Sequence, residues 1–417
     1  MYYFRMVAQM SNGRRHTQKT AYPAFTNPTP LGTASTVTAV NISLGNGADS
    51  GINTDIRVNP YRNMFYVAAQ FTNTPGARAP SNYSANSDGS NPVYRNLSNG
   101  NSTSGNDFLV PNIVLDFENN KFIQSANSFT LGEKPVQFHC NFEETTCSYQ
   151  DVSVGQANLS GATPFGVLDP YTGNSITITR NRTASVNTLS MFNCDNDGAN
   201  CKFTNLSSFG QGAETGYDAH ATIDPYDAKL LIAVRNNSPS ATALNTAYLF
   251  RCEIDGSACT FTDISAGQVA NTATAPFITI DHINSKILTF TQNASAFGTL
   301  SLYRCDLSGL NCVHYDISSL AGLGGNSGNS PSAILDPINN KMLIHTQNAN
   351  TSGLSLFRCD LDVTNCTHTN LSSLYTTTID IAGITPSSAL DPVSGKTIIA
   401  SHNNITPVNG LPFAFIH

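Results

Sequence analysis

The stretch Leu302–Ser318, LYRCDLSGLNCVHYDIS, places two cysteines seven positions apart, on either side of a turn that contains glycine. The same pattern returns at Leu249–Ser265, LFRCEIDGSACTFTDIS, and at Leu356–Ser372, LFRCDLDVTNCTHTNLS. Looser copies begin at Gln137 and Met191. Residues that face each other across a two-stranded hairpin lie close enough to meet disulfide geometry. The pattern therefore predicts repeated β-hairpins that are closed by disulfides.

All ten cysteines fall into five such pairs. A zinc site needs closer spacing and usually histidine partners, so disulfides are favoured over metal ligation and free thiols, and no cofactor is predicted. Disulfides persist in oxidising compartments, which favours an extracellular or cell-surface location. The first residues, MYYFRMVAQMSNGRR, lack the uninterrupted apolar segment of a signal peptide, which leaves the export route open. The predicted disulfides are Cys140–Cys147, Cys194–Cys201, Cys252–Cys259, Cys305–Cys312 and Cys359–Cys366.

A second motif, DPxxxK or a close variant, marks the period of the chain. It fits a turn, because proline presets φ and asparagine or glycine takes the permissive backbone conformation. Its seven copies lie 53 to 57 residues apart, and a fixed period of this size is typical of a solenoid, a propeller or an array. The copies start at Val58, Leu115, Leu168, Ile223, Ile280, Leu335 and Leu390, and the preceding strands are expected to end near residues 59, 116, 169, 224, 281, 336 and 391.

Each repeat reads as four short strands, which is typical of a propeller blade. Apolar runs such as KLLIAV from Lys229 follow the turn, and the cysteine hairpin joins the last two strands. After Leu390 the chain supplies only three strands, whereas Ser35–Leu44, STVTAVNISL, reads as an outer strand without a repeat of its own. The N-terminal strand is therefore expected to complete the last blade, which would remove the open edges of the ring.

This arrangement resembles the ring closure of seven-bladed β-propellers, and the resemblance covers residues 35–417. It implies an all-β fold with four-stranded antiparallel blades in a single domain, preceded by an extended or disordered arm, residues 1–34. The hairpin position is also similar to the Asp-box turn of sialidase-type propellers, although the Asp-box consensus is absent. Two blades depart from the cysteine pattern, and we expect Asn96 at the cysteine position of the first blade and Ile416 or His417 at that of the last.

The charge of the chain limits its partners. Charged residues make up 12% of the sequence, about half the usual fraction. The net charge of −7 argues against a nucleic-acid partner, because phosphate binding needs a basic face. No run of about 18 apolar residues occurs, so no transmembrane segment is predicted. The arm is different, because it is basic and has no acidic residue; its charged residues are Arg5, Arg14, Arg15 and Lys19.

The resemblance also predicts where a ligand would bind. In propellers generally, the two kinds of tight turn lie on one face and the longer loops lie on the other, which we call the variable-loop face. Loops on a rigid scaffold tend to carry function. Amide side chains gather where the second strand of each repeat ends, and they either bind a polar ligand such as a glycan or satisfy backbone groups at the strand ends. The candidate ligand-binding residues are Arg180, Arg182, Asn236, Asn237, Gln292, Asn293, Gln347, Asn348, Asn403 and Asn404.

Catalysis has little support, since the sequence has no GxSxG, HExxH or phosphate-loop motif. A glycosidase needs two facing carboxylates, and the variable-loop face offers only Glu214, Asp218 and Asp380 as scattered candidates. A sialidase also needs converging arginines, for which Arg235 would have to join Arg180 and Arg182. The sequence therefore favours a non-catalytic scaffold, adhesive or structural, that binds a glycan or a surface protein. A glycan-active enzyme is the alternative.

Two further alternatives stay open. The hairpins CDNDG from Cys194 and CDLD from Cys359 each place two carboxylates two positions apart, and such residues either bind calcium or simply make turns. The basic arm reads either as a disordered leader or as an assembly arm that docks on a neighbouring acidic propeller, which would make the protein self-associate.

Overall fold

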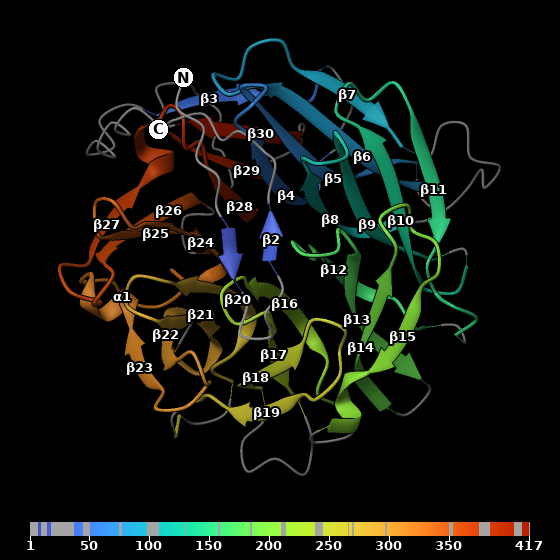
Figure 1. Ribbon diagram of the computed structural model, residues 1–417. Coiled ribbons are helices and arrows are strands. Elements are labelled where there is room, and N and C mark those ends of the chain that lie inside the picture. Colours follow the sequence, from blue (N-terminus) through green and yellow to red (C-terminus); the bar gives the residue numbers. More distant parts are fainter. Residues whose placement is uncertain are drawn as a thin grey trace.

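The computed structural model describes residues 7–9, 15–17, 37–44, 51–74, 77–97, 108–129, 131–156, 159–183, 186–209, 214–237, 245–265, 267–268, 271–296, 298–349, 353–374, 384–403 and 411–416. They form seven four-stranded sheets around a central axis, together with a separate two-stranded hairpin (Figure 1). Six blades consist of four consecutive strands each, and the seventh sheet is composite, because β3 joins β28, β29 and β30. The prediction of an all-β propeller with four-stranded antiparallel blades is confirmed.

The strands of each blade run in chain order from the axis outward, so the first strand of each is the innermost. The first three blades are β4 (Ile52–Asn59), β5 (Met64–Thr74), β6 (Ala77–Asn86) and β7 (Val93–Asn96); β8 (Phe108–Asp116), β9 (Lys121–Ser128), β10 (Lys134–Asn141) and β11 (Cys147–Asp151); and β12 (Ala162–Leu168), β13 (Ser175–Thr183), β14 (Val186–Cys194) and β15 (Lys202–Asn205). The next three are β16 (Tyr217–Asp224), β17 (Lys229–Asn236), β18 (Thr246–Glu253) and β19 (Thr260–Asp263); β20 (Thr274–Asp281), β21 (Lys286–Asn293), β22 (Thr299–Asp306) and β23 (Val313–Asp316); and β24 (Asn329–Asp336), β25 (Lys341–Asn348), β26 (Gly353–Asp360) and β27 (Thr367–Asn370).

The composite blade closes the ring as the sequence predicts. It contains β28 (Ile384–Leu390), β29 (Thr397–Asn403), β30 (Leu411–Ile416) and β3 (Thr38–Asn41). The N-terminal strand β3 pairs with β30 in an antiparallel register that joins Thr38 to Ile416 and Asn41 to Phe413. The remaining elements are β1 (Val7–Gln9), β2 (Arg15–Thr17), η1 (Leu206–Phe209), η2 (Ala294–Ala296), α1 (Ile317–Leu320) and η3 (Leu371–Leu374).

The DPxxxK motif forms the turn between the first two strands of each blade. In most copies the aspartate side chain accepts a backbone N–H from two residues further on, as Asp169 does from Tyr171 at 2.8 Å and Asp224 from Tyr226 at 2.9 Å. Both aspartates are buried, so these hydrogen bonds replace lost water contacts. The aspartate in the motif is thus explained by the turn it caps.

The cysteine pairs form five disulfides, all in the predicted combinations, and no described cysteine is free. Each disulfide closes the hairpin between the third and fourth strands of its blade. A loop this short, once crosslinked, is stabilised by about 2 kcal/mol or less, mainly through restriction of the unfolded chain.

The expected cysteine position in the first blade is wrong. Ala85 pairs with Phe65 as Cys252 pairs with Leu230, and Pro92 follows Ala85 by seven residues. The pair of cysteines is therefore replaced by Ala85 and Pro92, while Asn96 lies at the far end of β7. Asn96 was predicted because VYRN, residues 93–96, looks like the YRC and FRC strands of other repeats. The seven-residue spacing of the cysteine pairs identifies Ala85 and Pro92 as their equivalents instead. In the composite blade, Ile416 pairs with Ile398 as Asn193 pairs with Ile176, so Ile416 lies one residue before the cysteine position. The other predicted alternative, His417, lies outside the described residues.

Two hairpin residues depart from their equivalents. The fifth residue of four hairpins is a glycine with φ between 80° and 82°, but in the sixth blade it is Val363, with φ 72°, and in the second blade it is Glu144, with φ 56°. The Glu144 side chain is 3% exposed, and its nearest cation is Arg95 of the first blade, whose Nε lies 3.6 Å from Oε2. Burial raises the pKa of Glu144 to about 7, although hydrogen bonding from Ser84 and the charge of Arg95 act in the opposite direction. Burial therefore disfavours the ionised form.

We expect the substitution Glu144→Gln to stabilise the protein above pH 7. Because the folded-state pKa of about 7 exceeds the usual glutamate pKa of 4.5, the folded state binds more protons between these values, and stability falls as the pH rises through this window. The loss in the wild type should reach about 3 kcal/mol by pH 8, and the neutral amide should remove it. Urea unfolding at pH 5 and pH 8 measures the difference.

The control for this prediction is Glu143→Gln, in the same hairpin, whose side chain is 44% exposed. The hydrogen bond from Arg62 lowers the pKa of Glu143, so this variant should keep the fall in stability between pH 5 and pH 8. If the free energy of unfolding fell by the same amount between pH 5 and pH 8 in the wild type and in Glu144→Gln, the raised pKa of Glu144 would be contradicted.

Candidate functional site at the mouth of the central channel

Each innermost strand carries a β-bulge at the equivalent place, one or two residues after it starts, and the bulged residue has a left-handed φ between 44° and 53°. In five blades a proline follows the bulged residue, and a bulge tolerates proline because its extra residue is unpaired. The bulged residues are Asn53, Val110, Thr163, Asp218, Ala275, Ser330 and Thr385.

These bulges surround a cavity of about 340 Å³ on the axis of the propeller. Three consecutive residues from each innermost strand line it, beginning with the bulged residue. The innermost strands start at the variable-loop face, so the cavity is the mouth of the central channel on that face. The lining segments are 53–55, 110–112, 163–165, 218–220, 275–277, 330–332 and 385–387.

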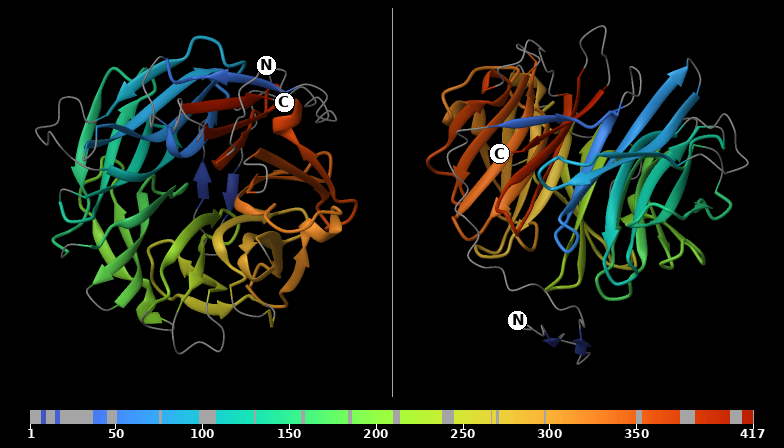
Figure 2. Two further views of the ribbon diagram at one scale, coloured as in Figure 1. Left: turned by 180° about the vertical axis from the view of Figure 1, so that it is seen from behind. Right: turned by 90° about the horizontal axis from the view of Figure 1, so that it is seen from above.

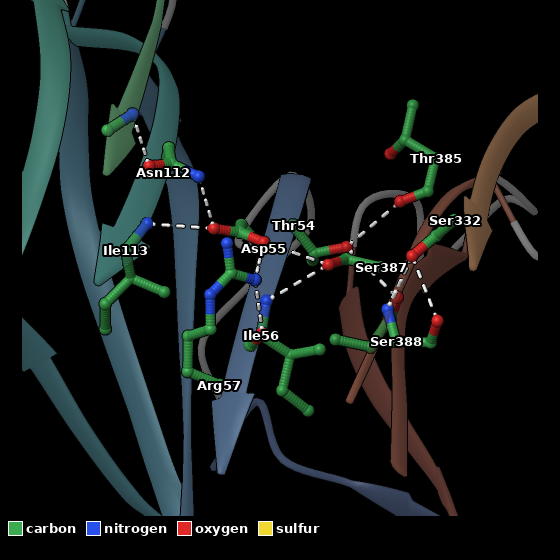
Figure 3. Close-up of polar contacts among 12 residues, drawn as sticks. Thr54, Asp55, Ile56, Arg57, Asn112, Ile113, Ser332, Thr385, Ser387 and Ser388 are labelled. Carbon is green, nitrogen blue, oxygen red and sulfur yellow. Dashed lines mark hydrogen bonds and ion pairs between the residues drawn. The ribbon is translucent and has the colours of Figure 1, made fainter. Parts of the chain in front are cut away.

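Asp55 connects three blades at this mouth (Figure 3). Its Oδ2 accepts hydrogen bonds from Asn112 Nδ2 at 2.6 Å and from the backbone N–H of Ile113 at 2.9 Å, both in the second blade. Its Oδ1 accepts from Ser387 Oγ of the composite blade at 3.0 Å and from Arg57 Nη1 of its own strand at 2.7 Å. With four donors around one carboxylate, Asp55 is a structural group.

The same contact recurs around the mouth. At the third residue of the lining segment, the side chain accepts the backbone N–H of the neighbouring blade. Asn112 accepts from Gly166 at 2.7 Å, Ser332 from Ser388 at 3.0 Å, and Ser387 from Ile56 at 3.2 Å. We call this set of contacts the inter-blade ring; its acceptors are Asp55, Asn112, His220, Ser332 and Ser387.

His220 takes part in this ring and divides the channel. Its imidazole lies between the rings of Phe165 and Phe277, with centroid distances of 4.1 and 4.2 Å, and Nδ1 accepts the N–H of Ile278 at 3.2 Å. Burial, followed by the charge of Arg57, holds the pKa of His220 well below its usual value, so the ring is neutral. Beyond these three rings lies a second channel cavity of about 560 Å³.

A cluster of charged and aromatic residues adjoins the mouth between the third and fourth blades. The Arg180 and Arg235 guanidinium carbons lie 4.7 and 5.1 Å from the centre of the Tyr217 ring, which is within cation–π range. Arg235 also pairs with Asp218 at 2.9 Å. Arg182, two residues after Arg180, pairs with Glu133 at 3.3 Å.

Glu214 completes this cluster. Its Oε2 accepts from the Tyr217 hydroxyl at 2.8 Å, and both carboxylate oxygens accept from Asn187 Nδ2 at 2.9 and 3.0 Å. Burial raises the pKa of Glu214, but the hydrogen bonds from Tyr217 and Asn187 outweigh it, so the net pKa lies below its usual value. Burial, together with the hydrogen bond to Glu214, raises the pKa of Tyr217. At neutral pH the pair is therefore a carboxylate and a protonated phenol.

Arg180 is the cation of this cluster that lacks a carboxylate partner among the described residues. Burial lowers its pKa, and the charges of Arg182 and Arg235 lower it further because like charges disfavour the ionised form, while Asp218 and Tyr217 act in the opposite direction. Arg180 nevertheless remains a cation at neutral pH, since the usual arginine pKa exceeds 12. A partly buried, unpaired guanidinium is suited to an anionic ligand.

Strand register explains why these arginines meet. The residue one position before each bulge pairs with a residue near the end of the second strand, so Ala162 faces Arg180 and Tyr217 faces Arg235. These partners form a ring of polar side chains at equivalent places in the seven sheets, namely Gln70, Asn127, Arg180, Arg235, Gln292, Gln347 and His402.

The structure places the predicted amides on this side of the molecule but uses several of them within the fold. Asn236 is fully buried, and Asn293 Oδ1 accepts from Ser295 Oγ at 2.6 Å and from the N–H of Ala296 at 3.1 Å. Gln292 donates to Asn329, and Asn237 forms a hydrogen bond with Tyr217 in the arginine cluster. Gln347 and Asn348 end β25, and Asn403 ends β29, whereas Asn404 and Asp380 lie outside the described residues.

The acidic hairpins that suggested calcium make turn contacts. Asp197 Oδ1 accepts the N–H of Ala199 at 3.0 Å, and Asp362 Oδ1 accepts from Thr364 Oγ1 at 2.6 Å. Within the described part of the chain, no group of three or more His, Cys, Asp or Glu side chains could hold a metal ion. The turn interpretation accounts for the carboxylates seen here.

Sequence reasoning missed Tyr217, Asn187 and the inter-blade ring. A signal for the ring was present, because a proline stands five residues before the motif aspartate in five repeats, as Pro164 does before Asp169. For Tyr217 and Asn187 there was no such signal, since their contacts depend on the register between strands of different blades.

Comparisons with known proteins identify the fold of the chain but assign it to no family. No protein-family model matches the chain, and no curated protein does. Among solved structures, the polysaccharide lyase Uly1 is similar with a TM-score of 0.55 and 8% identity over 88% of this chain and 90% of its own. The GH74 xyloglucanase from Xanthomonas campestris is similar with a TM-score of 0.53 and 13% identity over 90% of this chain and 55% of its own. A protein of unknown function from Dyadobacter fermentans is similar with a TM-score of 0.52 and 10% identity over 75% of this chain and 94% of its own.

These similarities define the class of protein: the chain is a β-propeller with hairpin disulfides. At 8 to 13% identity they support the fold alone. Among the described residues, no helix is both long enough and apolar enough to cross a membrane.

We expect Asp55→Ala to destabilise the fold. The substitution leaves Asn112 Nδ2 and the Ile113 N–H without their acceptor and removes the partner of Arg57, which should lower the free energy of unfolding by about 2–4 kcal/mol. Urea unfolding at pH 7 measures it.

The matched control is Asp88→Ala, which removes an exposed aspartate from the hairpin of the same blade. It should change the unfolding midpoint far less than Asp55→Ala. Equal midpoints for the two variants would show that the inter-blade ring does not hold the blades together.

Proposed function

We propose that the protein is a non-catalytic extracellular scaffold that binds a carboxylate-bearing glycan through its variable-loop face. The ligand would lie at the channel mouth, with its carboxylate on Arg180 and its hydroxyl groups on the polar ring that includes Gln292 and Gln347. Guanidinium groups recognise carboxylates through two parallel hydrogen bonds, and amides supply both donors and acceptors to hydroxyls.

The observation that carries this proposal is the unpaired guanidinium of Arg180. Arg182 and Arg235 each form an ion pair with a carboxylate, whereas Arg180 contacts the Tyr217 ring and forms no ion pair with a described carboxylate, although the charges of Asp218 and Glu214 act on it from a greater distance. A cation that is ordered by an aromatic ring and forms no ion pair of its own is pre-organised for an anionic ligand.

Two further findings support the proposal. Structures with the same fold include proteins named as a polysaccharide lyase and a xyloglucanase, which makes a carbohydrate ligand the natural first choice. The five disulfides support an oxidising compartment, and hence an extracellular location in which glycans are available.

Binding should depend on Arg180. We expect Arg180→Gln to weaken binding of oligosaccharides that carry uronic or sialic acids by at least about 10-fold, the loss of roughly 1.4 kcal/mol or more that a charge-assisted pair provides. Isothermal titration with each oligosaccharide and with its carboxyl-reduced counterpart measures this, and the reduced counterpart should bind the wild type as weakly as the acid binds the variant.

The control variant is Lys202→Gln, which removes a cation from the outer strand β15, next to the cysteine hairpin. It should leave binding unchanged. Equal affinity of the wild type and Arg180→Gln for the acidic sugars would refute the proposal.

A glycan-active enzyme is the second candidate, and the hydrogen bond between Tyr217 and Glu214 favours it, because a tyrosine serves as the nucleophile in some glycosidases. The raised pKa of Tyr217 argues against this role, since a protonated phenol is a poor nucleophile.

We therefore expect no hydrolysis of a panel of acidic oligosaccharides by the wild type, measured by mass spectrometry of the products after prolonged incubation. Hydrolysis that is abolished in both Tyr217→Phe and Glu214→Gln, with binding retained, would establish the enzyme and overturn the non-catalytic assignment.

A further inference from the structure

The face opposite the candidate site exposes a ring of apolar side chains. The turn between the first two strands of a blade presents one such side chain, two residues after the motif aspartate or asparagine or, for Phe117, directly after the aspartate. We call these residues the turn-tip ring. Exposed apolar groups gathered in this way mark interaction surfaces. The most exposed members are Tyr226 at 80%, Ile338 at 68%, Ile283 at 63%, Val393 at 51%, Tyr61 at 40% and Phe117 at 39%.

This ring surrounds the other mouth of the channel. Phe117, Pro170 and Pro225, which belong to these turns, line the 560 Å³ cavity that lies beyond His220. The turn-tip ring and this cavity therefore form one continuous surface around the axis, separated from the variable-loop face by the rings of Phe165, His220 and Phe277.

The same face is strongly acidic. The seven DPxxxK-type turns and the six hairpins formed within single repeats contain eighteen acidic and six basic residues, a balance of −12, although the whole chain carries only −7. The remainder of the chain, with ten acidic and fifteen basic residues, is therefore positive by five. Counting the four basic residues next to the hairpins, Lys202, Arg251, Arg304 and Arg358, still leaves −8.

The N-terminal segment leaves the propeller at this face. Strand β3 begins at Thr38, which pairs with Ile416 as Lys202, the first residue of β15, pairs with Asn193 directly before Cys194. The residues before β3 therefore start beside the hairpins and not beside the variable loops. Figure 2 shows the β1–β2 hairpin of this segment clear of the ring.

We infer that residues 1–34 dock on the turn-tip face of their own propeller. The segment carries Arg5, Arg14, Arg15 and Lys19 without any acidic residue, and the stretch MYYFRMV supplies aromatic and aliphatic side chains. Several hairpin carboxylates, such as Glu253 and Asp360, already pair with lysines of the propeller, so the basic residues match the excess negative charge of this face. The apolar residues match the turn-tip ring. The partner of this surface is thus a basic, aromatic segment of the same chain.

Docking within one molecule follows from reach and concentration. About twenty residues separate β2 from β3, and an extended chain of that length spans up to roughly 70 Å, so the segment can reach the axis from the rim. A tether of about twenty residues gives an effective concentration on the order of millimolar, well above ordinary protein concentrations. Docking on a neighbouring molecule is therefore disfavoured.

Limited trypsin digestion of the full chain tests this inference, because the segment contains cleavage sites at Arg14 and Arg15. We expect the triple variant Tyr226→Ser, Ile283→Ser, Ile338→Ser to be cleaved there at least about 10-fold faster than the wild type, as followed by intact mass. The three side chains are more than 60% exposed, so the substitutions leave the core unchanged, and unchanged urea midpoints verify this.

The matched control is Phe129→Ser with Phe209→Ser, which removes two exposed aromatic residues, 50% and 43% exposed, from the loops of the opposite face. It should be cleaved at the wild-type rate. Equal cleavage rates in the wild type and the triple variant would overturn docking. A wild-type dimer in sedimentation that becomes monomeric in the triple variant would overturn docking within one molecule. Arg180→Gln should leave cleavage unchanged, so this inference and the proposed glycan binding fail independently.

Discussion

The fold depends on a hydrogen bond from the backbone of one blade to a side chain of the next. An innermost strand has a sheet partner on one edge only, and its other edge faces the axis and the neighbouring blade. A buried N–H there without an acceptor would cost about 1–3 kcal/mol. The bulge solves this problem, because it turns the following side chain towards the next blade, where Asp55, Asn112 and Ser332 accept such an N–H. Where phenylalanine takes this position, at Phe165 and Phe277, ring stacking on His220 fills the space instead.

This constraint is most severe at the closure of the ring. The composite blade and the first blade are joined at the rim by β3 alone, and at the axis they meet through Ser387 and Asp55. Ser387 both donates to Asp55 and accepts the N–H of Ile56, so the contact is reciprocal. Asp55 also accepts a hydrogen bond from Asn112 of the second blade. The same carboxylate therefore connects the composite blade, where the ring closes, to both the first and the second blade. The ring is thus fixed at its inner edge by two residues that are 332 positions apart in the chain, and at its outer edge by the pairing of β3 with β30.

The sequence was sufficient to predict the features that repeat from blade to blade, but it was not sufficient to predict the contacts that depend on the register between strands. The disulfides, the DPxxxK turns and the closing strand follow from local spacing, since each is a contact between residues close in the chain or an edge that must be filled. Asn96 was misplaced because its surroundings resemble a strand, and only the pairing of Ala85 with Phe65 shows which residue replaces cysteine. The arginine cluster was anticipated as three separate residues, but the Tyr217 ring that orders Arg180 and Arg235 could not be, because it joins two blades.

In a repeat protein, a residue that departs from its equivalents is more informative than one that is merely polar. Seven places in the ring see nearly the same backbone, so the fold asks for the same side chain at each. Glycine meets this demand at four hairpins, and a buried glutamate at the fifth residue of another is costly in both φ and charge. Likewise, amides suffice at four places of the polar ring, and arginine stands at two neighbouring ones only. The repulsion between these two adjacent charges opposes folding, and the fold offsets it with the Tyr217 ring, which both arginines contact, and with Asp218, which pairs with Arg235. Arg180 forms no ion pair of its own among the described residues, and it is there that the proposed anionic ligand would add a partner.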